Sequence, residues 1–172
     1  MTYVLMADAA FAANIPPGFE IAAGYYGGPN AYHVWSASEW KRFPGYKLPI
    51  WVGGQEGARE GAQAVTVLKA LRVPSGAITA LDMETRKDIT YVEHFAGVLG
   101  KSDYKVWVYG SESTVFQNPP VNGYWVADYT SDMHVIDYIM TQGHVRAVQY
   151  SSNAGWDSSL VKQWTEGEMW HG

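Results

Sequence analysis

Apolar residues recur along this chain at two spacings, and the two spacings alternate. Short apolar segments bounded by Gly, Pro, Asn or Ser are typical of strands that are buried in a sheet. We expect strands at residues 3–8, 20–26, 47–52, 77–85, 105–109, 123–129 and 145–150, with an eighth around residues 156–157.

Segments with helical spacing lie between these strands. The clearest is residues 56–71, where Ala62, Val65 and Leu68 recur at three-residue intervals on one face. A second helix is expected to begin at Asp88 or at Thr90, because Thr90 and Glu93 fit a capping box. Further helices are expected at residues 31–42 and, with Ser131 or Asp132 as the cap, through Met140.

The alternation of strands and helices predicts an α/β fold with a parallel sheet. Seven or eight strands can close a TIM barrel, but the helices are too short and too few for a full (β/α)8 domain of about 250 residues. We therefore expect a trimmed (β/α)8-type barrel, with an open doubly wound sheet as the alternative. The 172 residues are expected to form one domain, residues 1–172, in which only residues 164–172 form a loose tail.

The charge and composition of the chain argue against several classes of ligand. A net charge of -5 and a pI near 5.4 argue against binding to nucleic acid, which needs clustered Lys and Arg. The chain has no Cys and its five His are scattered, so no metal site is expected. The glycines of residues 53–57 miss the spacing of a dinucleotide site, and no cofactor is expected.

The N-terminal residues lack the basic region of a signal peptide, and Asp8 interrupts their apolar run. No apolar run approaches the ~20 residues needed to cross a bilayer. We therefore expect a soluble protein that is made in the cytoplasm and does not insert into a membrane. Action outside the cell would then require another route of release.

Two acids dominate the candidate chemistry. Asp82 and Glu84 follow an apolar strand and leave it on the same face, because strand side chains alternate. Their backbones lie roughly 6 to 7 Å apart, so both carboxyl groups can reach one bond of a ligand. This arrangement is typical of acid-base cleavage of a glycosidic bond, and Glu84, the outermost acid, is the expected general acid. The alternative is that Arg86, Lys87 or Arg146 neutralises the pair.

Further candidates lie near the ends of the other strands, where the sites of such barrels gather. Acids and aromatic rings are the common types, because the rings can stack against sugars. Taken singly, each ring is more often a core residue than a ligand platform. The candidates beside Asp82 and Glu84 are Asp8, Tyr26, Trp51, Tyr109, Trp125 and Gln149.

Several of these residues belong to short sequence blocks that occur together in a recognisable order. The blocks are Asp8 and residues 24–28, 48–53, 81–84, 108–111, 125–129 and 148–150, followed by Asp157. In this order the chain resembles glycoside-hydrolase-like proteins related to family 25 lysozymes, and in particular their shorter actinobacterial and phage branch.

The resemblance implies a (β/α)5β3-like barrel that cleaves the β-1,4 bond after N-acetylmuramic acid in peptidoglycan. It implies that Glu84 is the acid, that Asp82 is the second carboxylate or assists the acetamido group, and that Asp8 and Asp157 line the site. The alternative is a non-catalytic module of a virion or cell envelope, which binds a glycan or has a structural role and keeps the hydrolase barrel.

Overall fold

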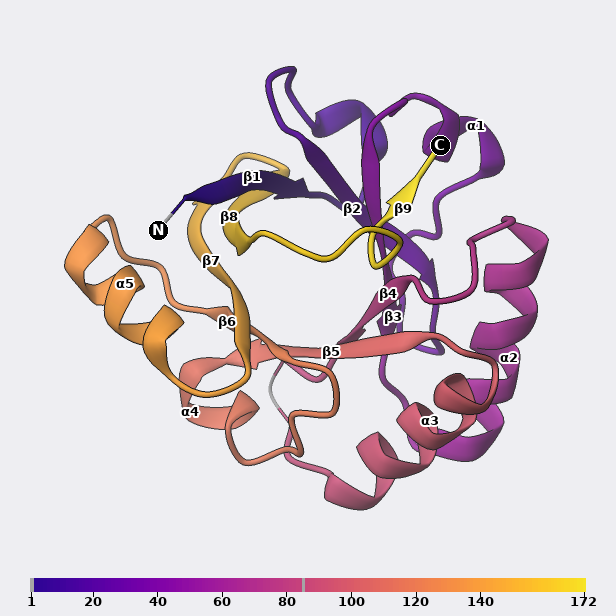
Figure 1. Cartoon of the computed structure of the whole chain (residues 1–172). Coiled ribbons are helices and arrows are strands. Elements are labelled where there is room, and N and C mark those ends of the chain that lie inside the picture. Colours follow the sequence, from indigo (N-terminus) through magenta and orange to yellow (C-terminus); the bar gives the residue numbers. More distant parts are fainter. Residues whose placement is uncertain (1, 85) are drawn as a thin grey trace.

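The computed structural model of the chain describes residues 2–84 and 86–172 and contains a closed barrel of eight strands (Figure 1). Strands β1 to β7 are parallel, and β8 lies antiparallel between β7 and β1. The trimmed α/β barrel is therefore confirmed, and the open doubly wound sheet is excluded. The strands of the barrel are β1 (Tyr3–Asp8), β2 (Ile21–Gly27), β3 (Tyr46–Val52), β4 (Ile78–Asp82), β5 (Lys105–Ser111), β6 (Tyr124–Ala127), β7 (Val145–Asn153) and β8 (Trp156–Lys162).

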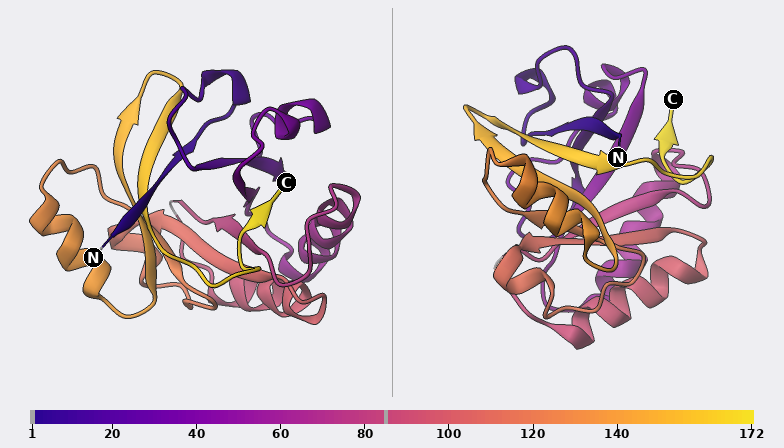
Figure 2. Two further views of the ribbon diagram at one scale, coloured as in Figure 1. Left: turned by 45° about the horizontal axis from the view of Figure 1, so that its top comes forward. Right: turned by 60° about the vertical axis from the view of Figure 1, so that its left-hand side comes forward.

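Five α-helices and one 3-10 turn cover the barrel, and they are unevenly distributed. The long helices α2 and α3 lie side by side on one flank, and α5 lies apart from them (Figures 1 and 2). None of the helices in the described part of the chain is long and apolar enough to cross a membrane. The helical elements are η1 (Ala12–Asn14), α1 (Ala37–Lys41), α2 (Gly57–Ala70), α3 (Ile89–Lys101), α4 (Glu112–Val115) and α5 (Met133–Thr141).

Two glycines explain the close packing of α2 against α3. A Cβ atom on Gly57 would lie 2.4 Å from the backbone oxygen of Tyr91, and one on Gly61 would lie 3.1 Å from that of Phe95. These residues are four apart and so share one face of α2. The absence of side chains there lets the two helix backbones approach each other.

One expected helix start differs from the structure, and the structure decides between the two starts considered for another helix. The helix expected over residues 31–42 begins only at Ala37, because the backbone N–H of Trp35 donates to the oxygen of Tyr25 and holds the preceding segment against β2. Ser36 then starts α1 through a capping box with Glu39. Of the two starts considered for α3, Asp88 is the N-cap, since its carboxylate accepts a hydrogen bond from the backbone N–H of Tyr91.

Alternate residues of each strand enter two separate cores. One core fills the barrel and includes Met6, Ile21, Leu48, Ala80 and Trp107. The other lies between the barrel and its helices. This alternation decides which side chains at the strand ends can face the mouth of the barrel.

The C-terminal segment is packed, contrary to the expectation of a loose tail. Strand β9 (Trp170–His171) pairs with the beginning of β3, and Trp170 is buried. Glu168 accepts a hydrogen bond from the Lys105 side chain at 2.8 Å, and its backbone oxygen accepts one from the N–H of Ile78. The segment therefore closes the end of the barrel opposite the carboxyl ends of β1 to β7.

Candidate functional site

Four carboxylates meet at one end of the barrel. Asp8 ends β1, Asp82 ends β4 and Glu84 follows it by two residues. Because β8 runs the other way, its beginning lies at the same end, and Asp157 there is the direct cross-strand partner of Asp8. Residues from the first, middle and last parts of the chain thus converge on one mouth.

Asp82 and Glu84 differ in their exposure. Asp82 is half-buried, and its Oδ1 accepts a hydrogen bond of 3.0 Å from the backbone N–H of Glu84, which orients the carboxylate. Glu84 is exposed. Both line a cavity of about 260 Å³ together with Asn30 and Arg86. A ligand in this cavity would meet both acids.

Asp8 is held by a buried hydrogen-bond network. Its Oδ1 accepts a hydrogen bond of 2.9 Å from the amide nitrogen of Gln149. The amide oxygen of Gln149 accepts hydrogen bonds from the hydroxyls of Tyr109 at 2.7 Å and Tyr129 at 2.9 Å. These contacts fix the amide orientation of Gln149 and connect β1, β5 and β7 beneath the mouth.

The pKa values of two of the acids are raised. The pKa of Asp8 is raised to about 8, mainly by burial and then by the charge of Asp157, while the hydrogen bond from Gln149 partly opposes the rise. Burial also raises the pKa of Asp82 to about 7, with the charge of Glu84 as the second cause. Both carboxyls therefore carry protons over part of the neutral pH range.

Two of the three cations considered as partners for these acids form ion pairs with other carboxylates, although Arg86 also lines the cavity beside Asp82 and Glu84. Arg86 lies 3.7 Å from Asp88 and above the ring of Tyr91, and Arg146 lies 3.7 Å from Glu168 at the far end of the barrel. Across residues 2–84 and 86–172, no ion pair involves Lys87 or any of the four acids at the mouth. The acids are not neutralised by salt bridges within the part of the chain that is described.

The structure places the expected aromatic residues in two different cores. Tyr109 and Trp125 lie inside the barrel with ring centroids 4.6 Å apart, and Trp125 donates to the Ser159 hydroxyl below the mouth. Tyr26 and Trp51 lie in the outer core instead. The Tyr26 hydroxyl accepts a hydrogen bond from Thr79, and the Trp51 indole donates to Glu60, so neither ring faces the acids.

Two tyrosines at the mouth were not among the expected site residues. Tyr25 packs against the barrel interior, and its pKa is raised by burial and then by the charges of all four acids. Tyr129 is exposed, and its hydroxyl joins the Gln149 network. Small residues lie on both faces of β2, so its sequence does not select Tyr25 over Tyr26, and no sequence signal indicates Tyr129.

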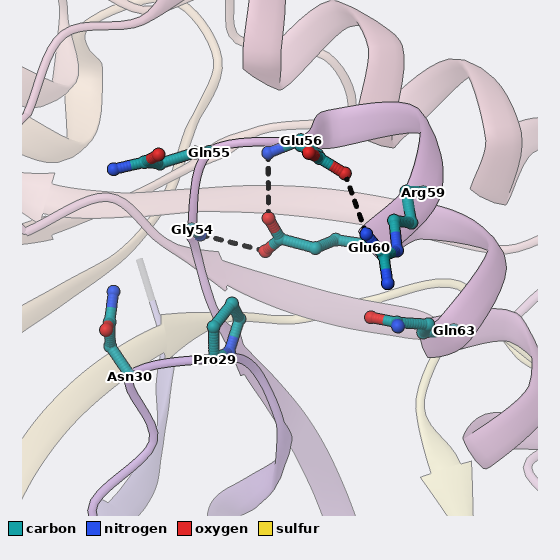
Figure 3. A pocket seen from close by; sticks show the side chains of 8 residues that line it. All are labelled: Pro29, Asn30, Gly54, Gln55, Glu56, Arg59, Glu60 and Gln63. Carbon is teal, nitrogen blue, oxygen red and sulfur yellow. Dashed lines mark hydrogen bonds and ion pairs between the residues drawn. The ribbon is translucent and has the colours of Figure 1, made fainter.

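A second cavity of about 430 Å³ adjoins the first and shares Asn30 with it. The amide side chains of Asn30, Gln55 and Gln63 line it, as Figure 3 shows. At its floor Glu60 accepts hydrogen bonds from the backbone N–H groups of Gly54 and Glu56 (Figure 3). The two cavities extend from the carboxylates toward the beginning of α2.

Comparisons with known proteins bear on the fold. No family model matches the chain, and no curated protein matches it in sequence. Solved structures do match. An uncharacterised protein of B. stearothermophilus aligns with 97% of this chain and 100% of its own length, at 14% identity and a TM-score of 0.71.

A muramidase from Acremonium alcalophilum aligns with 93% of this chain and 94% of its own length, at 14% identity and a TM-score of 0.64. The modular Cpl-1 endolysin, solved with a peptidoglycan analogue, aligns with 94% of this chain at 13% identity and a TM-score of 0.65, over 55% of its own length. The chain has a lysozyme-like fold. At these identities the likeness concerns the fold alone, and it confirms the trimmed barrel that was expected from the resemblance to lysozymes.

Within the described residues, no three His, Asp or Glu side chains are arranged to share a metal ion. The described side chains at the mouth offer carboxyl, hydroxyl and amide groups, and Arg86 adds a guanidinium group at the cavity.

Proposed function

We propose that this protein is a glycoside hydrolase that cleaves β-1,4 bonds in peptidoglycan. The observation that carries the proposal is the convergence of Asp8, Asp82, Glu84 and Asp157 on one barrel mouth without an ion-pair partner among the described residues. Glycosidic cleavage passes through a positively charged, oxocarbenium-like state, which a group of carboxylates stabilises.

Glu84 is our candidate for the acid that protonates the leaving oxygen. It is the exposed member of the pair and borders the cavity that a glycan would enter. Asp82 is oriented by the backbone N–H of Glu84 and is the candidate second carboxylate, which stabilises the anomeric centre or assists the acetamido group. Asp8 and Asp157 would line the site beneath the sugar, and the raised pKa of Asp8 leaves its carboxyl largely protonated at neutral pH.

The proposed site has further contacts for a glycan. Tyr109 and Gln149 belong to the network that orients Asp8, and Tyr25 and Tyr129 border the same mouth. Trp125 supports Tyr109 from below. The peptidoglycan-analogue complex of the Cpl-1 endolysin supports a glycan as the ligand of this fold.

An assay on purified peptidoglycan tests the proposal. The wild type is expected to release reducing ends, and Glu84→Gln and Asp82→Asn are each expected to lower the rate at least about 100-fold, the usual contribution of a positioned acid or base. Glu93→Gln is the matched control, because Glu93 is an exposed carboxylate on α3. Equal rates in the wild type and both site variants would contradict a catalytic role for these acids.

A binding measurement separates the hydrolase from a non-catalytic module. Sedimentation with insoluble peptidoglycan is expected to show that Glu84→Gln still binds although it no longer cleaves. If the wild type binds peptidoglycan and releases no product from it, the protein is a glycan-binding or structural module of a virion or cell envelope.

A further inference from the structure

Another cavity lies at the opposite end of the barrel from the carboxylates. It has a volume of about 520 Å³ and lies between the beginning of β3, the ends of α1 and α2, and β9. Figure 1 shows β9 beside α1 in this region. Lys47 on β3 lines this cavity, whereas Val52 at the other end of the strand pairs with Asp82. The two sites are thus separated by roughly 16 Å along β3.

Three basic side chains line this cavity, together with His171 and the C-terminal residue Gly172. Lys41, Lys47 and Arg72 line it, and no Asp or Glu side chain does. No ion pair among residues 2–84 and 86–172 involves any of these three cations. Arg72 also stands directly after α2 with a φ of 61°, a position where glycine is the usual residue.

Lys47 is the most unusual of the three cations. The residue is 1% exposed, and its Nζ has no hydrogen-bond partner in the described part of the chain. The ring of Trp170 offers it a weaker, cation–π contact, with the centroid 5.0 Å from Nζ. Burial lowers the pKa of Lys47, as expected for an ammonium group without an acceptor.

Trp40, which also lines this cavity, supplies a second unsatisfied donor. Its indole Nε1 is buried and has no hydrogen-bond partner among the described residues. Folded proteins leave few buried donors unpaired, because a donor that leaves water without gaining an acceptor destabilises the fold. Two such donors at one cavity, beside two further cations, indicate a site that is complete only when an acceptor occupies it.

We propose that this cavity binds the phosphate group of a small molecule or polymer, with Lys47 and Trp40 as buried donors and Lys41 and Arg72 as cations at its rim. A phosphate offers several strong acceptor oxygens and more charge than a carboxylate, which suits three cations and an indole N–H. The volume leaves room for the group that carries the phosphate. This site does not depend on the proposed hydrolase activity.

Nuclear magnetic resonance of the full chain tests the site. Inorganic phosphate is titrated at constant ionic strength, and the Trp40 indole N–H signal, assigned with Trp40→Phe, is followed. The wild type is expected to show a saturable downfield shift, and Lys47→Met is expected to weaken phosphate binding at least tenfold. Lys69→Gln is the matched control and should bind as the wild type does, because Lys69 is exposed on the last turn of α2 and does not line the cavity.

Thermal unfolding distinguishes a ligand-binding lysine from a purely structural one. Without phosphate, Lys47→Met is expected to melt at a higher temperature than the wild type, because it removes a buried, unpaired ammonium group. A lower melting temperature would indicate a structural lysine and would contradict the proposal. Peptidoglycan cleavage should be unchanged in Lys47→Met, so the phosphate site and the hydrolase site can fail separately.

The choice of anion tests the chemistry of the site. Titration with glycerol phosphate and dimethyl phosphate distinguishes a monoester from a diester source, and acetate tests whether any small anion suffices. Phosphate is expected to bind more tightly than acetate, because it carries more charge and more acceptor oxygens. The absence of a saturable shift, unchanged binding by Lys47→Met, or acetate binding as tight as phosphate binding would each overturn the proposal.

Discussion

At the scale of single residues, the four acids at the mouth differ in their burial and in their hydrogen bonds. Asp8 is nearly covered and bound to Gln149, whereas Glu84 is exposed, so chemically similar side chains face different solvation. Desolvation penalises the charged form of a carboxyl, and a neighbouring carboxylate adds repulsion. The raised pKa of Asp82 combines both causes, and they can be separated experimentally.

Removing the charge of Glu84 should lower the pKa of Asp82. In Glu84→Gln the repulsion is lost and burial remains, so the pKa is expected to fall from about 7 by about one pH unit and to stay above its ordinary value. Carbon-13 NMR titration of the Asp82 carboxyl measures this change. Glu93→Gln on α3 should leave the titration unaltered, and an unaltered titration in Glu84→Gln would show that the two acids do not interact.

At the scale of the elements, the connection from β3 to α2 depends on one buried acid. Glu60 lies in the first turn of α2 and is 4% exposed. It accepts hydrogen bonds from the Trp51 indole, the Tyr91 hydroxyl, and the backbone N–H groups of Gly54 and Glu56. These four donors join β3, α2 and α3 and lower the pKa of Glu60 against the effect of its burial.

Glu60→Gln should therefore destabilise the fold. A glutamine cannot accept from all four donors, and the free energy of unfolding is expected to fall by about 2–4 kcal/mol at pH 7. Because the folded-state pKa of Glu60 is lowered, this stabilisation is present above its ordinary pKa of 4.5 and is lost as pH falls below it. Thermal unfolding at pH 7 and pH 3 should show the difference narrowing in acid.

A nearby acid serves as the control for this experiment. Glu56→Gln alters an exposed ion pair with Arg59 on the same turn and should change stability by less than about 0.5 kcal/mol. Equal effects of the two substitutions would mean that the Glu60 contacts do not stabilise the connection.

The elements also show what could be predicted about the site before the structure was known. Alternation of polar and apolar residues correctly placed Asp82 on the inward face of β4, because a carboxylate there stands out among apolar neighbours. Strand β2 contains apolar residues on both faces, since it is covered inside and outside. Its pattern therefore offers no clear choice between Tyr25 and Tyr26, and Tyr26 was expected at the site although it lies in the outer core. Strand β3 is also buried on both faces, so Trp51 was likewise expected at the site although it lies in the outer core.

At the scale of the whole molecule, closure of the barrel brings the candidate site together. Asp8 and Asp157 lie far apart in the sequence and become cross-strand partners only because β8 inserts antiparallel between β7 and β1. Local patterns predicted the strands, but only the resemblance to known proteins indicated Asp157. This convergence has an electrostatic cost, because each added carboxylate raises the free energy of ionising the others.

The stability of the whole barrel should therefore decline as pH rises. The folded-state pKa of Asp8 is about 8, above its ordinary value of 3.8, so its contribution is fully present below about pH 4 and is lost as pH rises through 8. Asp8→Asn keeps the acceptor for Gln149 and removes the charge. Between pH 4 and pH 8 the wild type is expected to lose more unfolding free energy than this variant, by on the order of 2–4 kcal/mol.

Chemical denaturation across this pH range measures the effect, with Glu93→Gln as the control that should follow the wild type. Asp8→Asn is expected to be the more stable protein at pH 8 and the poorer hydrolase, because removing a buried active-site charge commonly stabilises a fold while impairing its chemistry. Parallel stability curves for the wild type and Asp8→Asn would mean that Asp8 ionises at the same pH in the folded and unfolded chains. The mouth would then be better hydrated than its packing indicates, and its acids would not repel one another strongly enough to hold a proton at neutral pH.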